Sequence, residues 1–346
     1  VQPHYNDLVV ATYGRGFWIL DDITPLRTLA ADILAKDAHF FAPRLAYRLR
    51  DAEQPFAMWY DPSAGFNPPY GASVNYWLKI GSDSASSKDS VTITIADAGG
   101  AVVRTMKGPV SAGVNRVWWN LRADLTKQAK IRTPPEYAPW SAVGLDGRNT
   151  PTVGRFAVLV PPGAYTVKLT TPGGQSMTQP LVVRQDPNTG ASDAELAENI
   201  GLTRQVAKDL NEAVVMINAL ESVRGQLAAL KATIAGDSTH KDLVSGVDSL
   251  DGKLRVVERR LFQTRATGRG QDLIRYPSRL AEQLEYLAGS VQGSDFAPTA
   301  AQREVSVLLR DQLQAVRAEY ERVMARDVAA FNALLQQRRI PNVISE

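Results

Sequence analysis

The chain has 346 residues, 44% hydrophobic and 22% charged, a balance that is typical of a folded globular protein with two or three domains and unlike that of a disordered chain. Its 39 basic and 36 acidic residues leave a net charge of only +3, so the clustered cations that nucleic-acid binding needs are missing and that class is disfavoured. The sequence has no cysteine, which excludes disulfides and thiolate metal sites, and no apolar run of about 18 residues that would span a membrane.

The chain enters directly on a strand pattern at Val1, without a starter Met or a signal-like segment, and we expect it to be a piece of a longer polypeptide. Leu8–Thr12 and Phe17–Leu20 flank Tyr13-Gly14-Arg15-Gly16, which predicts a β-hairpin. A lone hairpin is marginally stable in water, so we expect it to be buried against another surface.

Asp21 and Asp22 follow the hairpin and, as a pair, suggest acid–base or metal chemistry. Consecutive strand residues point to opposite faces, however, so turn or capping roles are favoured. Pro25–Leu34 is predicted to be a short connecting helix with Thr24 as its N-cap.

Alternating apolar residues then predict about seven short strands between residues 70 and 184, including Val91, Ile93 and Ile95 and, later, Tyr165, Val167 and Leu169. Polar turns separate these strands. This spacing is typical of an antiparallel β-sandwich of the immunoglobulin or fibronectin type.

Residues 124–153 interrupt the strand rhythm with four prolines and are too long for a passive hairpin loop. It is either a functional loop or packing for a neighbouring domain, and of the two we expect it to contact a partner protein. Aromatic and arginine side chains anchor most interfaces, so its interaction candidates are Tyr137, Trp140 and Arg148. Trp59, Tyr60 and Trp140 are the residues that a carbohydrate-binding sandwich would use.

After Ser192 and Glu195, which form a capping box, the apolar period becomes helical. We expect one helix of about 60 Å ending near Gly236, a second from Thr239, a third near Pro277, and a last one opened by a second capping box at Thr299 and Gln302. Short connections between amphipathic helices predict an antiparallel four-helix bundle. The chain therefore divides into a hairpin and connector over residues 1–55, the sandwich over 56–187 and the bundle over 188–346.

No residue set nominates a catalytic, cofactor or metal site. The histidines His4, His39 and His240 are far apart in sequence, and no nucleophile elbow, zinc-binding helix motif or dinucleotide fingerprint occurs. Five arginines near the second interhelical turn are a further surface that an anionic partner would recognise, although helix ends favour cations in any case: Arg259, Arg260, Arg265, Arg269 and Arg275.

Several motifs carry a family resemblance: Asn6–Thr12 with Gly14-Arg15-Gly16, Leu20–Leu26, Asn67–Ala72, Trp119–Arg122, Pro161–Tyr165 and Tyr276–Leu280. These motifs resemble the C-terminal region of bacterial exported BNR-repeat proteins, the sortilin-like group often labelled glycosyl hydrolase. The resemblance implies that the hairpin is a remnant of a β-propeller lying upstream, and that the protein is periplasmic or extracellular. A hydrolytic site of such a family would lie on the propeller, so no catalytic residue is carried over.

The leading hypothesis is a non-catalytic structural module that docks to a protein partner or larger complex of the bacterial envelope, with peripheral contact to a membrane complex left open. Two alternatives remain. One is the accessory C-terminal part of a secreted glycoside hydrolase or peptidase, and the other is a carbohydrate-binding sandwich. No cofactor and no nucleic acid are expected.

Overall fold

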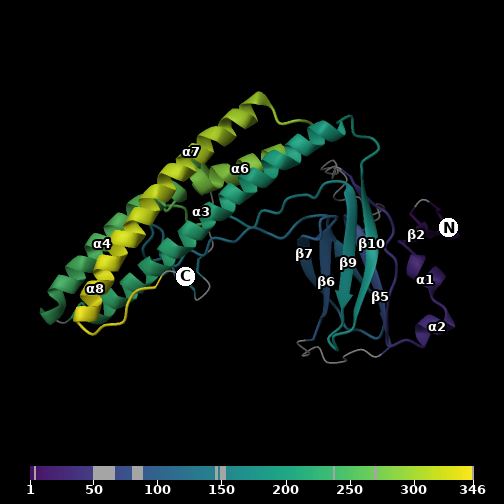
Figure 1. Cartoon of the computed structure of the whole chain (residues 1–346), viewed down its shortest axis with the longest axis horizontal. Helices are drawn as coiled ribbons and strands as arrows, with labels where there is room; N and C mark the ends of the chain where they lie inside the picture. The colour runs from purple at the N-terminus through teal and green to yellow at the C-terminus, as the bar shows by residue number, and fades with distance from the viewer. Residues whose placement is uncertain are drawn as a thin grey trace. The chain divides into compact units, whose positions relative to one another are not determined.

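The computed structural model describes residues 1–3, 5–49, 67–79, 89–144, 147–148, 153–236, 238–268 and 271–344 (Figure 1). It divides into two compact units: a β unit of Val1–Asp124 with Leu159–Gly190, and a helical unit of Leu125–Val158 with Ala191–Glu346. This division differs from the expected one because Leu125–Val158 leaves the β part and joins the helices. In the described residues, no helix combines the length and the apolar character needed to cross a membrane.

The described part of the β unit contains three sheets. The first pairs β1 (Leu8–Ala11) with β2 (Phe17–Leu20). The second has the order β3-β5-β8, with bounds Ala38–Phe40, Ala72–Leu78 and Gly113–Trp119. The third has the order β4-β10-β9-β6-β7, with bounds Ala46–Arg48, Ser176–Gln185, Gly163–Thr170, Val91–Asp97 and Val102–Gly108. Neighbouring strands are antiparallel except β10 and β4, which run parallel.

The three-stranded and five-stranded sheets share one hydrophobic core. The alternation predicted in β6 and β9 is confirmed: every second residue, from Val91 to Ile95 and from Tyr165 to Leu169, is buried. Trp119 in β8 is fully buried and its ring meets that of Tyr165 edge-on at 5.4 Å. Burial of these rings and branched side chains is the main force holding the two sheets together.

The N-terminal connector supplies two strands to the β core: β3 belongs to the three-stranded sheet and β4 to the five-stranded sheet. The single helix predicted over Pro25–Leu34 is wrong. Two short helices occur, α1 (Thr24–Thr28) and α2 (Ala31–Leu34), because Leu29 and Ala30 are extended. Thr24 is not the N-cap; its hydroxyl donates to Asp22 at 2.6 Å.

The helical unit contains helices of very different lengths. Their bounds are α3, Asp193–Ile234; α4, Lys241–Leu261; α5, Asp272–Arg275; α6, Leu280–Gln292; α7, Ala300–Arg322; and α8, Ala329–Gln337. A 3₁₀ turn, Ser238–His240, precedes α4. α3 has 42 residues, so the predicted helix of about 60 Å is confirmed. α3, α4, α6, α7 and α8 bury their apolar sides in one core.

Both predicted capping boxes are present. Ser192 N donates to Glu195 at 2.9 Å and Glu195 N donates back to Ser192 at 3.3 Å, and Thr299 and Gln302 form the same reciprocal pair. A π-helical segment, Val323–Val328, joins α7 to α8 and was not predicted. The buried residues Val323 and Val328 are five positions apart, a spacing that a π turn keeps on one face and an α-helix does not.

The proline-rich segment packs on α3. Lys127 N donates to Asn211 at 2.9 Å, and Lys130 N donates to Asn218 at 2.7 Å. Three residues of extended chain, from Lys127 to Lys130, span about 10 Å. Seven residues of helix, from Asn211 to Asn218, also span about 10 Å, so the two donors of the segment face the two acceptors of α3. Ile131 is fully buried in the helical core. This segment therefore packs against the chain's own helices, which agrees with the alternative of packing for a neighbouring domain and not with the partner protein that was expected.

Candidate functional site

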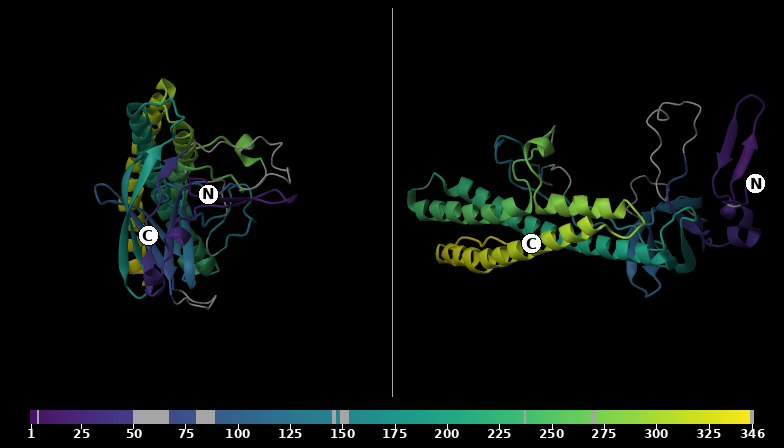
Figure 2. Two further views of the ribbon diagram at one scale, coloured as in Figure 1. Left: turned by 90° about the vertical axis from the view of Figure 1, so that its right-hand side faces the viewer. Right: turned by 90° about the horizontal axis from the view of Figure 1, so that it is seen from above.

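The β1–β2 hairpin is the most unusual surface of the β unit, because all of its strand residues are exposed. Phe17, Trp18 and Ile19 are 77%, 67% and 61% exposed. Figure 2 shows the hairpin standing clear of the other strands of this unit. In the part of the chain that the structure describes, the hairpin is therefore not buried against the β core of its own unit, and the expected burial against another surface stays a prediction. A contiguous exposed apolar surface of this kind usually marks an interaction site.

Both faces of the hairpin are apolar. The register pairs Leu8 with Leu20 and Val10 with Trp18 on one face, and Val9 with Ile19 and Ala11 with Phe17 on the other. A sheet that is wetted on one side alternates apolar and polar residues, whereas strands covered on both sides do not. The hairpin therefore has the composition of strands buried on two faces, although the described part of the chain covers neither.

A polar network at Asp22 fixes the base of the hairpin to the outer face of the three-stranded sheet. The Asp22 carboxylate, 1% exposed, accepts from Ser73 Oγ at 2.5 Å and from Thr24 Oγ1 at 2.6 Å. Its backbone N–H donates to Asp7 at 2.8 Å. Arg116 donates to the carbonyl oxygens of Asp21 and Asp22 at 2.8 and 2.5 Å. The hairpin consequently leaves the sheet from a fixed base, and Asp22 has a structural role.

Burial alone raises the pKa of Asp22, but the hydrogen bonds from Ser73 and Thr24 and the charge of Arg44 outweigh it and lower the pKa below the ordinary value. The carboxylate is thus ionised across the neutral range. Since Asp21 is not part of this buried cluster, the pair does not act as two adjacent carboxylates sharing a proton.

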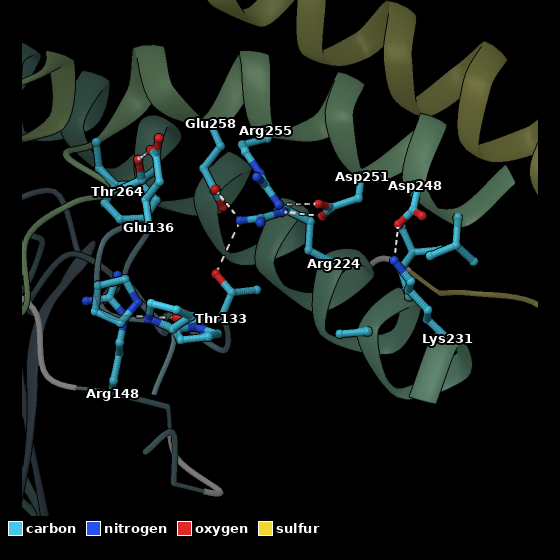
Figure 3. A pocket seen from close by; sticks show the side chains of 17 residues that line it. Thr133, Glu136, Arg148, Arg224, Lys231, Asp248, Asp251, Arg255, Glu258 and Thr264 are labelled. Carbon is cyan, nitrogen blue, oxygen red and sulfur yellow. Dashed lines mark hydrogen bonds and ion pairs between the residues drawn. The ribbon is translucent and has the colours of Figure 1, made fainter. Parts of the chain in front are cut away.

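The helical unit holds a second polar cluster, beside a cavity of about 360 Å³ (Figure 3). Arg224 of α3 lies at its centre. Its guanidinium donates to Asp251 at 2.8 Å and to Thr133 at 3.2 Å, and it also contacts Glu221 and Glu258. Glu221 in turn accepts from Thr133 N at 2.8 Å and from Thr133 Oγ1 at 2.8 Å. The cluster therefore joins α3, α4 and the proline-rich segment.

Glu258 is the fully buried carboxyl group that α4 contributes to this cluster. Burial raises its pKa well above the ordinary value, and the charge of Glu221 raises it further, against the opposing effect of Arg224. In the described part of the chain, Oε1 of Glu258 is buried and has no hydrogen-bond partner.

Glu221 and Glu258, which both contact Arg224, resemble an acid–base pair in their placement. Glu221 and Glu258 are fully buried, however, although Glu258 is among the residues that line the cavity. Each is occupied by Arg224 or by groups of the proline-rich segment. The arrangement holds α3, α4 and the proline-rich segment together. Among the described residues, no group of three or more His, Asp or Glu side chains is placed to hold a metal ion.

The predicted interaction residues lie in the helical unit. Trp140 is 81% exposed. Tyr137 is also exposed, with the Arg265 guanidinium 4.8 Å from its ring centroid and the Tyr276 ring edge-on at 6.2 Å. Arg148 donates to the carbonyl oxygens of Thr133 and Ala266 at 2.8 and 2.7 Å. Within the described chain, no hydrogen bond, ion pair or ring contact joins these three residues, and Trp59 and Tyr60 lie outside the described residues.

Three of the five arginines near the interhelical turn have internal partners. Arg259 pairs with Glu136 at 2.9 Å and Arg260 with Glu319 at 2.6 Å, while Arg265 lies on Tyr137. Arg269 lies outside the described residues. These contacts favour a structural role for the three arginines with described partners.

Glu285 of α6 gives the helical unit a titration near neutrality. Burial raises its pKa to about 7, although its carboxylate accepts from Gly154 N at 3.0 Å. Between about pH 4.5 and about pH 7 the unfolded chain releases this proton and the folded unit keeps it, so stability falls as pH rises through that window.

We expect Glu285→Gln, which keeps the oxygen acceptor and removes the titration, to reduce this fall. Urea midpoints of the helical signal measured across the window test the prediction. The exposed Glu198, which pairs with Arg303 at 2.8 Å, provides a matched control as Glu198→Gln. An equal pH dependence in wild type and Glu285→Gln would contradict the assignment.

The sequence contains a pattern that indicates the exposed hairpin and another that indicates the buried cluster around Arg224. Leu8–Ala11 and Phe17–Leu20 lack the alternation of a half-exposed strand. Glu221 follows Ile217 by four residues and Glu258 follows Leu254 by four, so each charge lies on the core side of its helix. Their partners were beyond sequence reasoning, because Thr133 and Glu221 are 88 residues apart.

Comparison of the chain with family models, with curated proteins and with solved structures finds no match in any of the three. The residues and their geometry are therefore the only basis for a functional conclusion.

Proposed function

We propose that this chain is a non-catalytic structural module that docks to a larger protein assembly through the β1–β2 hairpin. The observation that carries the proposal is the hairpin's surface: apolar side chains on both faces, exposed, on a base fixed by Asp22. The proposed occupant is β structure of the partner that covers both faces and pairs with the free strand edges, as in β-strand addition.

The rest of the chain serves in this proposal as a rigid scaffold. Its finer architecture is proposed to be an immunoglobulin-like β-sandwich and an antiparallel four-helix bundle. The resemblance to exported BNR-repeat proteins agrees with a propeller as the β structure that receives the hairpin, and with a periplasmic or extracellular location. It is support by analogy and carries no site residue.

The runner-up is an accessory part of a secreted glycoside hydrolase or peptidase. It differs from the first proposal in what the partner does, not in how this chain contacts it. The fully buried Glu221 and Glu258 favour a supporting role for this chain in either case. A carbohydrate-binding role at Trp140 rests on one exposed ring.

Replacing both Trp18 and Ile19 with serine is expected to release the protein from its native assembly, because the double change removes one large apolar side chain from each face of the hairpin. Losing such anchors weakens an interface by about 2 kcal/mol or more. Size-exclusion chromatography of native extracts, followed by mass determination, measures the release. The melting temperature of the free chain should change little, since both side chains are exposed.

Val102→Ser is the matched control, since Val102 is an apolar residue in β7 that is 60% exposed. It should leave the assembly intact. The docking proposal fails if the hairpin variant elutes with the assembly as wild type does, or if Val102→Ser releases the protein equally well.

A further inference from the structure

A cavity of about 560 Å³ lies in the β unit beside the base of the hairpin. This volume is within the usual range of ligand pockets. Its walls carry four aromatic rings and two prolines: Tyr5, Tyr47, Tyr70, Trp118, Pro68 and Pro69. Ile19 of the hairpin also lines the cavity. We propose that this cavity binds an extended, proline-containing peptide segment with a basic residue next to the prolines, a function beyond hairpin docking.

The rings are held in place by their neighbours. Tyr5 and Tyr47 meet edge-on, with centroids 6.4 Å apart, and the Arg44 guanidinium lies 5.2 Å from the Tyr5 centroid. Arg116 lies 5.9 Å from the centroid of Trp118. Rigid aromatic walls of this kind suit a polyproline II segment, whose rings pack on aromatic faces and which loses little entropy on binding.

Trp118 also supplies a hydrogen-bond donor. A polyproline II segment makes no internal hydrogen bonds, so its carbonyl oxygens need donors from the protein. Among the residues that the structure describes, the indole N–H of Trp118 donates to none. It is therefore free to donate to a peptide carbonyl, and an indole can only donate.

The carboxylate of Asp21 explains the preference for a basic residue. Asp21 lines the cavity, and its side chain forms no hydrogen bond or ion pair with the described part of the chain. Its carbonyl oxygen, by contrast, accepts from Arg116. A carboxylate beside an aromatic cavity favours a lysine or arginine of the ligand over an acidic residue.

A glycan is the rival ligand, and the lining disfavours it. Sugar hydroxyls need many hydrogen-bond partners, but the polar groups of this wall are largely occupied. Asp7 accepts from Asp22 N, Arg44 donates to Tyr5 O at 2.6 Å, and the Tyr70 hydroxyl donates to Leu49 O at 2.8 Å. A ligand of mainly apolar rings leaves fewer groups unpaired.

The test uses a synthetic peptide of about nine prolines with an arginine at each end, because a uniform polyproline II helix presents the same surface in every register. Isothermal titration calorimetry on the full chain should show saturable binding. Trp118→Phe, which keeps a ring and removes the N–H, should weaken binding by about fivefold, as expected for one hydrogen bond of about 1 kcal/mol.

Asp21→Asn should weaken binding of the arginine-flanked peptide by about fivefold and leave binding of a serine-flanked peptide unchanged. Trp140→Phe, at an exposed tryptophan of the helical unit, should bind as wild type does. The proposal is overturned if the chain does not bind the polyproline peptide, or if Trp118→Phe and Asp21→Asn bind it like wild type. It is also overturned if cello- or chito-oligosaccharides bind in a Trp118-dependent way and the peptide does not.

Discussion

Replacing Arg224 with Met is expected to lower the free energy of unfolding of the helical unit by about 3–5 kcal/mol. Arg224 is 8% exposed and is the cation that contacts Glu221, Asp251 and Glu258 together. Its removal leaves buried acidic groups facing one another without a positive charge. Guanidinium denaturation followed by the helical circular dichroism signal measures the loss.

The matched control is Arg255→Met. Arg255 pairs with the same Asp251 at 2.7 Å, but its side chain is 42% exposed. Exposed ion pairs contribute at most about 1 kcal/mol, so this change should be mild. Adding Glu258→Gln to Arg224→Met should restore part of the lost stability, because the amide keeps the shape of the carboxyl group and cannot carry a charge. Equal effects of the two arginine changes would contradict a central role for Arg224.

Replacing Asp22 with Ala is expected to destabilise the β unit by about 3 kcal/mol, since it leaves Ser73 without its buried acceptor and Arg44 without its ion-pair partner. Asp22 also has a φ of +47°, a left-handed conformation that Ala tolerates less well than Asn or Asp. Asp22→Asn should therefore cost less. Thermal unfolding followed by the circular dichroism of the β structure measures the stability of both variants against wild type. Asp21→Ala is the control and should change the stability little.

The pH dependence of these variants provides a second check. Because the folded pKa of Asp22 lies below the unfolded value of 3.8, its contribution is present above that value and is lost as pH falls through the folded pKa. The difference between wild type and Asp22→Asn should therefore shrink in acid. If the difference in stability between wild type and Asp22→Asn stays constant to low pH, the charge of Asp22 is not what stabilises the polar network at the base of the hairpin.

The sequence predicted the features that depend on local patterns. The strand alternation at Tyr165, Val167 and Leu169, the capping box at Ser192 and the length of α3 follow from residues only a few positions apart. The π segment at Val323–Val328 is also local, but it was not predicted. Its five-residue apolar spacing is hard to distinguish from the three- and four-residue spacings of the α-helices on either side.

Features that depend on distant partners could not be predicted. Asp22 meets Ser73 across 51 positions, and Lys130 meets Asn218 across 88. The proline-rich segment was expected to contact another protein, because nothing near it in sequence identifies Asn211, Asn218 and Glu221 as its hydrogen-bond partners. For the same reason, sequence analysis placed the candidate site at Tyr137, Trp140 and Arg148 and overlooked the cavity at Trp118.

Site-specific photo-crosslinking from position 18 tests the docking claim most directly, with position 168 as the control, since Lys168 is an exposed residue of β9 in the same unit. A photoreactive residue at each position, expressed in the native source, should crosslink to neighbouring protein only from position 18. Mass spectrometry should map the products to alternate residues of a β-strand in one partner segment. The account is contradicted if position 18 gives no crosslink, or if positions 18 and 168 give the same unspecific set of products.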